Sequence, residues 1–212
     1  MPTENKSNKI ITIVLALIIT LAAITVIYIN LPQNKEKTSN ENKGSQGEGN
    51  KTTTPVILTV TYGNNHTNYT LEGLEALESY IGMGGYRNSV GSIKGKGNYT
   101  GVNVTRLVEL TAGSIQNYSI NVTSNDGKEI ENKTFTYSEI LGDVDIYDPN
   151  NPSNSTPIGN GGLTMVLAYK YEGSYFNELK DGKLRTTFLD ESGSITSSGL
   201  WWKYVTSIKI IE

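Results

Sequence analysis

The sequence predicts an α+β fold of β-rich mixed sheets with a few short helices, preceded by one N-terminal transmembrane helix. Short segments that alternate apolar and polar residues recur from residue 56 to residue 211, and a period of two is typical of half-buried strands. Helical signals are few and short. One long uncharged run lies near the N-terminus. Strands in the majority, with helices at one side or end of the sheets, are the pattern of α+β domains.

The long run is "IITIVLALIITLAAITVIYI", residues 10–29, and it is uncharged over 20 residues. At about 1.5 Å per residue such a helix spans roughly 30 Å, the thickness of a bilayer's hydrocarbon core. A cleaved signal peptide usually has about 7–15 apolar residues before its cleavage site. We therefore predict an N-terminal tail and uncleaved anchor in residues 1–31, with a cleaved signal peptide as the alternative. Lysines flank the run on both sides, so the positive-inside rule does not choose an orientation.

Residues 32–54 contain no Ala, Val, Ile, Leu, Met or aromatic residue. A segment of this composition cannot bury enough apolar surface to offset the entropy lost on ordering, so it is expected to be a flexible polar linker. Residues 55–212 remain, and their number suits one domain.

Within this domain the first helix is expected to begin after Thr70, a good N-cap for "LEGLEALES". The second covers "VNVTRLVELTAG" and stops at Gly113, and "YSEILGD" adds a third short helix. Asn125-Asp126-Gly127 is a strong hairpin signal between two of the strands. The predicted strands cover residues 56–62, 118–123, 128–137, 163–171, 184–189 and 204–211.

Composition excludes several classes of function. The formal net charge of −3 does not suit a nucleic-acid-binding protein. The chain has no cysteine, which excludes disulfides, thiolate zinc sites and cysteine nucleophiles. Its one histidine, His66, lies in the polar run "GNNHTN" and is expected to be a solvated loop residue, because a metal site needs further ligands. A Ser-His-Asp triad is not expected, since His66 is the one histidine and no G-x-S-x-G motif occurs.

Glycosylation motifs are unusually frequent in the domain. Eight of its 15 asparagines begin an Asn-x-Ser/Thr triplet, whereas a chance distribution would give roughly three. The excess predicts a glycosylated domain outside the cytoplasm on a single-pass membrane protein, and a compositionally biased genome is the alternative. The candidate sites are Asn65, Asn68, Asn98, Asn103, Asn117, Asn121, Asn132 and Asn154.

The segment "GSIKGKGNYTG", from Gly91 to Gly101, has the glycines and lysines of a phosphate-binding loop, but its spacing does not match. Lys96 stands where the P-loop motif needs glycine, and Thr100 stands where the dinucleotide motif needs one. No convincing strand precedes the segment. We therefore interpret its glycines as turn residues that lead the chain into the helix near Val104.

Two other motifs, an acidic run and a tryptophan pair, carry side chains of types that bind ligands. Asp143, Asp145 and Asp148 lie in "GDVDIYDPNNPSN", which lacks the turn glycine and closing glutamate of a calcium loop, so a solvated loop is expected. Trp201 and Trp202 could stack on a carbohydrate. Neighbours in a strand point to opposite faces, so at most one of the pair is expected to line a site while the other packs in the core.

The order of segments resembles the sulfite oxidase-like, molybdopterin-dependent oxidoreductase domain family. "GNYTGVNVTRLVELTAG" is similar to that family's "G-x-[WY]-x-G-V-x-L-x-x-L-L-x-x-A-G" segment. Further similar segments follow in the family's order, and the set covers most of residues 70–212: "INVTSNDGKEIENKTFTYSEI", "MVLAYKYEG", "DGKLRTTFLD" and "LWWKYVTSIKII". The resemblance implies a sulfite oxidase-like fold.

The individual matches to this family are uneven. Gly97, Tyr99, Gly101 and Val102 match the turn into the helix, and Asp126 and Gly127 match a turn whose aromatic is Lys128 here. Leu184 and Arg185 match the family's "LR", with Lys183 in place of proline, and Trp201 or Trp202 with Lys203 matches the C-terminal site-facing strand. The family's molybdenum-binding cysteine is absent, and its cofactor-gripping histidine has no counterpart. Ser or Asn cannot replace a soft thiolate without changing the metal chemistry, so no cofactor is expected. Molybdopterin is expected only if the family's activity survives without the cysteine ligand.

We therefore expect a membrane-anchored protein that keeps the family's cofactor crevice without catalysis and binds a small anionic ligand or a partner protein of the cell envelope. Converging cations would favour an anion, although Arg87 and Arg185 could equally pair with surface carboxylates. An oxidoreductase with a non-cysteine metal site and a structural or adhesion module are the alternatives. The residues expected to line or flank the crevice are Tyr86, Arg87, Asn88, Lys94, Lys96, Tyr99, Arg185, Trp202 and Lys203.

Overall fold

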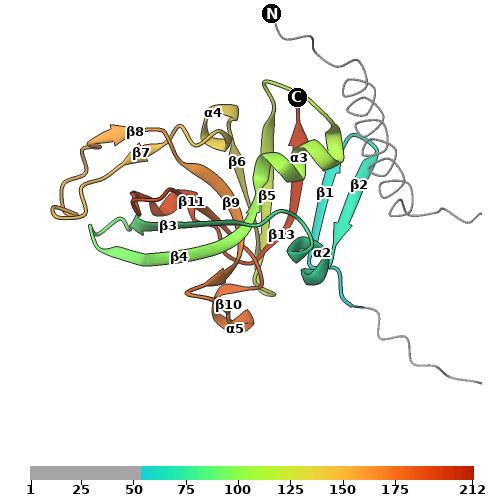
Figure 1. Cartoon of the computed structure of the whole chain (residues 1–212), viewed down its shortest axis with the longest axis horizontal. Coiled ribbons are helices and arrows are strands. Elements are labelled where there is room, and N and C mark those ends of the chain that lie inside the picture. Colours follow the sequence, from blue (N-terminus) through green and yellow to red (C-terminus); the bar gives the residue numbers. More distant parts are fainter. Residues whose placement is uncertain (1–53) are drawn as a thin grey trace, which may run out of the picture. The chain divides into compact units, whose positions relative to one another are not determined.

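The computed structural model describes residues 54–212, which belong to one compact unit (Figure 1). The predicted anchor, and the predicted linker up to residue 53, lie outside the described residues. None of the helices in residues 54–212 combines the length and the hydropathy needed to cross a membrane.

The first sheet has five strands in the order β2-β1-β13-β5-β6. β1 pairs with β13 in parallel and every other pair is antiparallel, so the sheet is mixed. On β1, β5 and β13 buried and more exposed residues alternate, as the period of two requires, and the buried positions are apolar except for Ser124. The strands are β1 (Leu58–Tyr62), β2 (Asn65–Tyr69), β5 (Ser119–Asn125), β6 (Ile130–Phe135) and β13 (Val205–Ile211).

The second sheet follows the order β10-β9-β4-β3-β12, and β11 also pairs with β9. β12 runs parallel to β3 and the other pairs are antiparallel. In Figure 1 the long strands β3 and β4 extend side by side to the left of the first sheet. The strands are β3 (Tyr80–Arg87), β4 (Ile93–Asn103), β9 (Thr164–Tyr171), β10 (Ser174–Tyr175), β11 (Arg185–Leu189) and β12 (Ile195–Ser197).

Short helices and one small hairpin complete the described fold. Capping residues begin three of the helices: the Thr70 side chain accepts from Gly73 N–H, Asn103 from Thr105 N–H, and Thr136 forms a capping box with Glu139. The elements are α2 (Leu71–Glu75), α3 (Val104–Ala112), α4 (Tyr137–Ile140), α5 (Glu178–Asp181), the 3₁₀ turn η1 (Ser198–Leu200) and the β7–β8 hairpin (Asp145–Ile146 and Gly159–Asn160).

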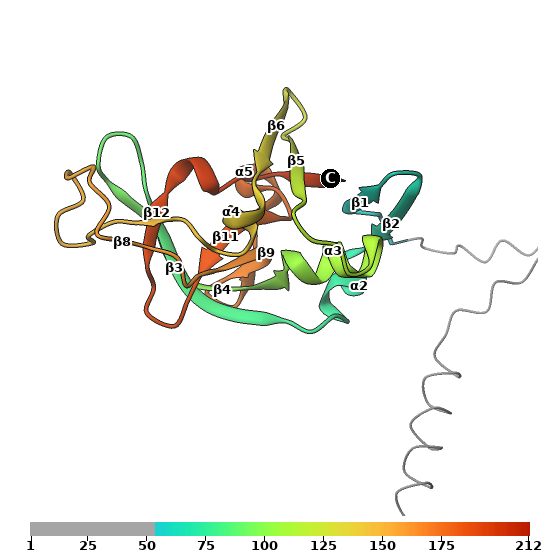
Figure 2. The same ribbon diagram turned by 90° about the horizontal axis from the view of Figure 1, so that it is seen from above.

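The core lies between the two sheets and is closed at one end by α3. Phe135 of β6 and Phe188 of β11 join the sheets, with ring centroids 6.2 Å apart. α3 contacts β1 and β2 of one sheet and β4 and β9 of the other, and Figure 2 shows it between these strands. Residues 165–169 of β9 are all buried, which shows that both faces of this strand are covered.

The predicted α+β class is confirmed: the sheets are mixed, the strands are in the majority and the helices are short. Each of the six predicted strands and each of the three predicted helices is present, with ends that shift by a few residues. The predicted hairpin signal also holds, because β5 and β6 are antiparallel and Gly127 has φ = 85°.

The interpretation of residues 91–101 as a glycine-rich turn is wrong. Most of this segment belongs to β4, an 11-residue strand, and β3 precedes it as its hairpin partner. Glycines interrupt the alternation of both strands, and the β3–β4 register shifts between Gly84 and Tyr86, so a period of two is not visible in the sequence. The turn is shorter and lies at Asn88–Ser92, where Asn88 and Ser92 exchange hydrogen bonds.

Two local expectations also need correction. His66 lies on β2 and not in a loop, although it is exposed as expected. Trp201 and Trp202 follow η1 in an irregular segment before β13 and so do not occupy a strand. Trp201 is buried and packs in the core, while Trp202 is half-buried against it.

Candidate functional site

An aromatic cluster fills the space between β4 and the segment after η1. The Tyr99 ring centroid lies 4.8 Å from Tyr171, 5.3 Å from Trp201 and 6.3 Å from Phe176. Tyr86 also contacts Trp201, with 5.3 Å between ring centroids. Tyr99 is 1% exposed, and its hydroxyl donates to the Gly95 carbonyl oxygen at 2.6 Å. The cluster is therefore packed like a core, with offset and edge contacts between its rings.

Burial raises the pKa of Tyr99 well above the usual range of a phenol, an effect that the nearby Arg185 guanidinium only partly offsets. The phenol therefore stays protonated at neutral pH, which agrees with its role as a donor to Gly95.

Arg185 stands at the start of β11 beneath this cluster, and its side chain is 7% exposed. Its Nη2 donates to Asp181 Oδ1 at 3.1 Å, and its guanidinium lies 5.6 Å from the Phe176 ring centroid. Its Nε is buried and has no hydrogen-bond partner among the described residues. Lys203 Nζ donates to the same Asp181 oxygen at 2.6 Å. Two cations thus share one carboxylate, so Arg185, Lys203 and Asp181 together carry a net positive charge.

A cavity of about 450 Å³ lies beside Trp202, between the β5–β6 hairpin and the segment from η1 to β13. We call it the Trp202 cavity. Trp202 is held by two bonds, since its backbone N–H donates to Thr186 Oγ1 and its Nε1 to the Gly199 carbonyl oxygen. The walls are Ser124, Asp126, Glu129, Glu131, Ser198, Gly199, Trp201, Trp202, Lys203 and Tyr204.

The charge of the Trp202 cavity is mainly negative. Asp126, Glu129 and Glu131 contribute carboxylates, and the one lysine of the lining, Lys203, is paired with Asp181. Backbone N–H groups of Glu129 and Lys128 lower the pKa of Asp126, so this carboxylate stays ionised. A cavity with three carboxylates and an indole favours a neutral or cationic group over an anion.

The predicted site residues divide into three groups in the structure. Tyr86, Tyr99 and Arg185 meet at the aromatic cluster, where Trp201 completes the contact. Trp202 and Lys203 line the Trp202 cavity.

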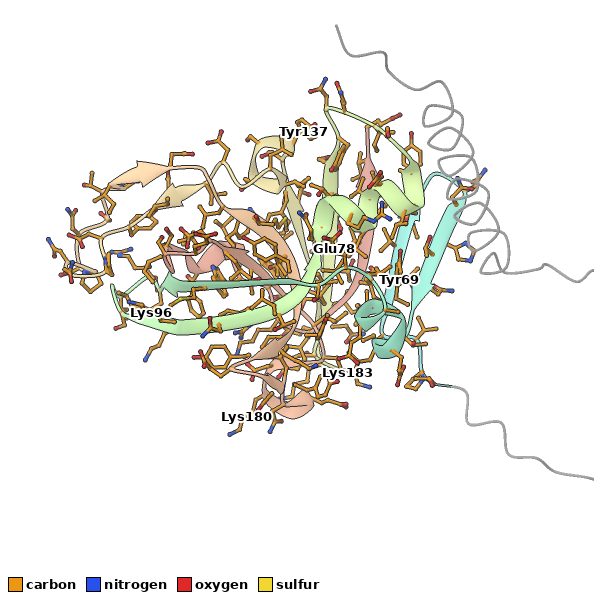
Figure 3. The ribbon with its side chains drawn as sticks, viewed as in Figure 1. Tyr69, Glu78, Lys96, Tyr137, Lys180 and Lys183 are labelled. Carbon is orange, nitrogen blue, oxygen red and sulfur yellow. The ribbon has the colours of Figure 1, made fainter. Side chains whose placement is uncertain are left out.

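The remaining predicted residues lie toward the β3–β4 turn. Arg87 donates to the carbonyl oxygens of Pro152 and Ser153, and its guanidinium lies 5.6 Å from the Tyr147 ring centroid. The Asn88 side chain accepts from Ser92 N–H and so stabilises the turn. Lys94 and Lys96 are exposed on β4, and Figure 3 shows Lys96 well away from Lys180 and Lys183. Arg87 and Arg185 thus bind different partners, the 152–153 segment and Asp181, and the two lysines are exposed on β4.

The acidic run lines a second cavity of about 400 Å³ through Asp143 and Asp145. The same cavity contains Lys133 and Glu139, whose charged atoms lie 3.8 Å apart. Within residues 54–212 no group of three or more His, Asp or Glu residues is arranged to hold a metal ion.

Sequence reasoning missed the residues that give both sites their charge. Asp181 lies four residues before Arg185 in the matched "DGKLR" segment, yet nothing in that spacing indicates that one carboxylate binds both Arg185 and Lys203. Glu129 and Glu131 fall within the predicted strand 128–137, and in the structure β6 begins one residue after Glu129. Which face looks into a cavity depends on the tertiary fold.

Among known proteins, the chain is similar in fold to a solved structure described below. No family model matches the chain. No curated protein matches it either. Among solved structures, the sulfane dehydrogenase SoxCD from Paracoccus pantotrophus matches with a TM-score of 0.50 and 12% sequence identity. The match covers 73% of this chain but only 37% of that one. It supports a loosely shared fold and does not by itself carry over that protein's activity.

Proposed function

We propose that the chain is a membrane-tethered, extracytoplasmic binding domain with a sulfite oxidase-like fold, that it does not perform molybdenum chemistry, and that its ligand site is the Trp202 cavity. The observation that carries the proposal is this cavity itself, with an indole and three carboxylates on its walls. Ligand pockets typically combine an apolar or aromatic wall with a few placed polar groups.

The residues present do not fit a molybdopterin cofactor. The sequence of 212 residues has no cysteine to supply a thiolate to the metal. The segment that would lie beside the metal is β4 and its neighbours, and there Tyr99, Trp201 and Arg185 are 1%, 6% and 6% exposed. The space next to Arg185 is thus filled by side chains.

The chemistry of the Trp202 cavity supports a ligand that carries an amine. Trp202 is half-buried and presents an aromatic surface to the cavity, and an organic cation is attracted to an indole face. Glu131 on β6 and Glu129 just before this strand are exposed and can pair with the same cation. The Asp126 carboxylate contributes charge, although its Oδ1 already accepts from two backbone N–H groups.

The proposed tether and location rest on the sequence. The uncharged run of 20 residues suits an anchor, and the polar linker suits a tether. Six of the eight sequon asparagines are exposed in the structure, which supports their use as modification sites: Asn65, Asn68, Asn98, Asn117, Asn132 and Asn154.

A fluorescence titration of the full chain in detergent tests the ligand site, because Trp201 and Trp202 are its only tryptophans. Spermidine is the cationic probe and sulfate the anionic probe, at matched ionic strength. We expect spermidine to change the emission of the wild type and to bind more weakly to Trp202→Phe, where the buried Trp201 on the same cavity wall reports the remaining binding. Glu131→Gln should weaken spermidine binding several-fold, whereas the control Glu72→Gln, on α2, should not.

A second candidate is a small anion at Arg185, favoured by the two cations on Asp181 and by the buried Arg185 Nε, which has no hydrogen-bond partner within residues 54–212. A response to sulfate that is lost in Arg185→Lys, without a response to spermidine, would support this candidate against the first. If neither probe changes the emission, both ligand assignments are wrong.

A further inference from the structure

The outer face of the first sheet, the face turned away from the core, carries hydroxyl and amide side chains in register. Leu58 and Val60 of β1 and Ile120 and Val122 of β5 are buried on the inner face. Strand alternation therefore turns Thr59, Asn121 and Thr123 outward, together with the residues paired opposite them on the edge strands. Six outward side chains form hydrogen bonds across strands: Thr59, Asn68, Asn121, Thr123, Asn132 and Thr134.

Two glycosylation sequons on this face interlock. Asn121-Val-Thr123 lies on β5 and Asn132-Lys-Thr134 on β6, with Asn121 opposite Thr134 and Thr123 opposite Asn132. The Asn121 Nδ2 donates to Thr134 Oγ1 at 3.2 Å, and Thr123 Oγ1 donates to Asn132 Oδ1 at 2.8 Å. Each sequon's threonine thus bonds to the other sequon's asparagine, but the two asparagines use different atoms.

This difference matters because N-glycosylation occurs on the amide nitrogen. In that reaction Nδ2 forms a bond to the anomeric carbon of a lipid-linked oligosaccharide, the bond from that carbon to the lipid phosphate breaks, and the amide loses one proton. Asn132 engages its Oδ1 in the Thr123 bond, which leaves Nδ2 outside that contact. Asn121 has its Nδ2 against Thr134.

The position of each strand in the sheet also distinguishes Asn132 from Asn121. β6 and β2 are the two edges of the five-stranded sheet, whereas β5 lies between β13 and β6. Asn132 on β6 and Asn68 on β2 are exposed, and Asn121 on β5 is half-buried. Asn68 resembles Asn132 in its bonding too, since its Oδ1 accepts from Thr59 Oγ1 at 2.9 Å. Asn68 and Asn132 therefore have a neighbouring strand on one side only, whereas Asn121 is flanked by strands on both sides.

We propose that the outer face of this sheet carries N-linked glycans on its two edge strands, at Asn68 and Asn132, and that Asn121 on the inner strand stays unmodified. Bulky glycans at both edges would block the pairing of this sheet with strands of another chain, which is a hazard of exposed edges. Neither asparagine lines the Trp202 cavity, so the proposed ligand site would remain open. The inference rests on the extracytoplasmic location in the proposed function.

Mass spectrometry of the full chain from its native membranes tests this proposal through three variants. Asn68→Gln and Asn132→Gln should each lower the intact mass by one glycan, and Asn121→Gln should leave the glycan mass unchanged. The variants are matched controls for one another, since each removes the asparagine from one cross-strand hydrogen bond. A glycan on Asn121, or an unmodified Asn68 or Asn132, overturns the proposal.

A second measurement separates this inference from the proposed location. Protease added to intact cells, or to spheroplasts where a wall blocks access, digests the domain only if it lies outside the cytoplasm. A digested but unglycosylated domain overturns the glycan proposal alone, and the location stands. A protected and unglycosylated domain overturns both. Digestion together with glycans on Asn68 and Asn132, and none on Asn121, supports both.

Discussion

At the scale of single residues, glycines in β4 let strands approach closely. Gly101 pairs with Ala168 of β9 next to a register shift in the β4–β9 ladder. A Cβ at this position would lie 2.3 Å from the Leu167 carbonyl oxygen and 2.5 Å from the Ala168 Cα. Both atoms are backbone, so neither can move without disturbing β9, whose residues 165–169 are buried.

We expect Gly101→Ala to lower the free energy of unfolding by about 1–3 kcal/mol or more, because the extra methyl group overpacks a closely fitted site. Chemical denaturation measures the change. Gly159→Ala, on β8, is the matched control, since no heavy atom lies within 4 Å of the Cβ it would add. Equal stabilities for the two variants would show that β4 and β9 separate easily at this point.

At the scale of elements, the sequence predicts those whose signal is local. α3 has its cap at Asn103 and its stop at Gly113, and β5 alternates between buried and half-buried residues. The strand β2, "NHTNY", carries one buried side chain, Tyr69, so its hydrophobic pattern is too weak to read. β3 and β4 are hidden by their glycines, because their stability comes from pairing with each other and with β9, which only the tertiary structure specifies.

The turn between β11 and β12 is held by one carboxylate. Asp190 Oδ1 accepts from the backbone N–H groups of Gly193 and Ser194, and its Oδ2 accepts from the hydroxyls of Ser192 and Ser194. Burial raises the pKa of Asp190, but the hydrogen bonds from Ser194, Ser192 and Gly193 together outweigh it and lower the pKa below its ordinary value of 3.8. The ionised carboxylate therefore stabilises the folded state.

A group with a lowered pKa in the folded state contributes stability above its unfolded pKa, and this contribution is lost as the pH falls through the folded pKa. We expect the difference in unfolding free energy between the wild type and Asp190→Asn to be constant above about pH 5 and to shrink as the pH falls below about 4. Urea denaturation at a series of pH values measures it. Ser194→Ala removes one hydroxyl donor to the carboxylate and so raises its folded pKa toward the unfolded value, so its loss of stability in acid should be smaller and should be complete at a higher pH. Parallel curves for the wild type and Asp190→Asn would contradict this account.

At the scale of the whole molecule, the candidate site was only partly predictable. The motif order brought Tyr99, Arg185 and Trp202 into consideration, and the fold places them on neighbouring elements. The lysines of the glycine-rich segment were expected there because that segment was interpreted as a loop. As part of a β-strand this segment places Lys94 and Lys96 at exposed positions. The charged partner of Arg185 is Asp181 instead, and the charge of the Trp202 cavity comes mainly from carboxylates such as Glu129 and Glu131.

The fold and the missing thiolate lead to a prediction about metal content. We expect the full chain purified from its native membranes to contain no stoichiometric molybdenum or tungsten by elemental analysis, because no cysteine is present and the aromatic cluster fills the space beside Arg185. The organic part of the cofactor is a second readout, since a pterin released by denaturation and oxidised is fluorescent. Neither the metal nor the pterin should exceed the amount in a matched preparation of an unrelated membrane protein from the same cells. One metal atom per chain, or a stoichiometric pterin without metal, would instead favour the oxidoreductase alternative and would require the aromatic cluster to open when the cofactor binds.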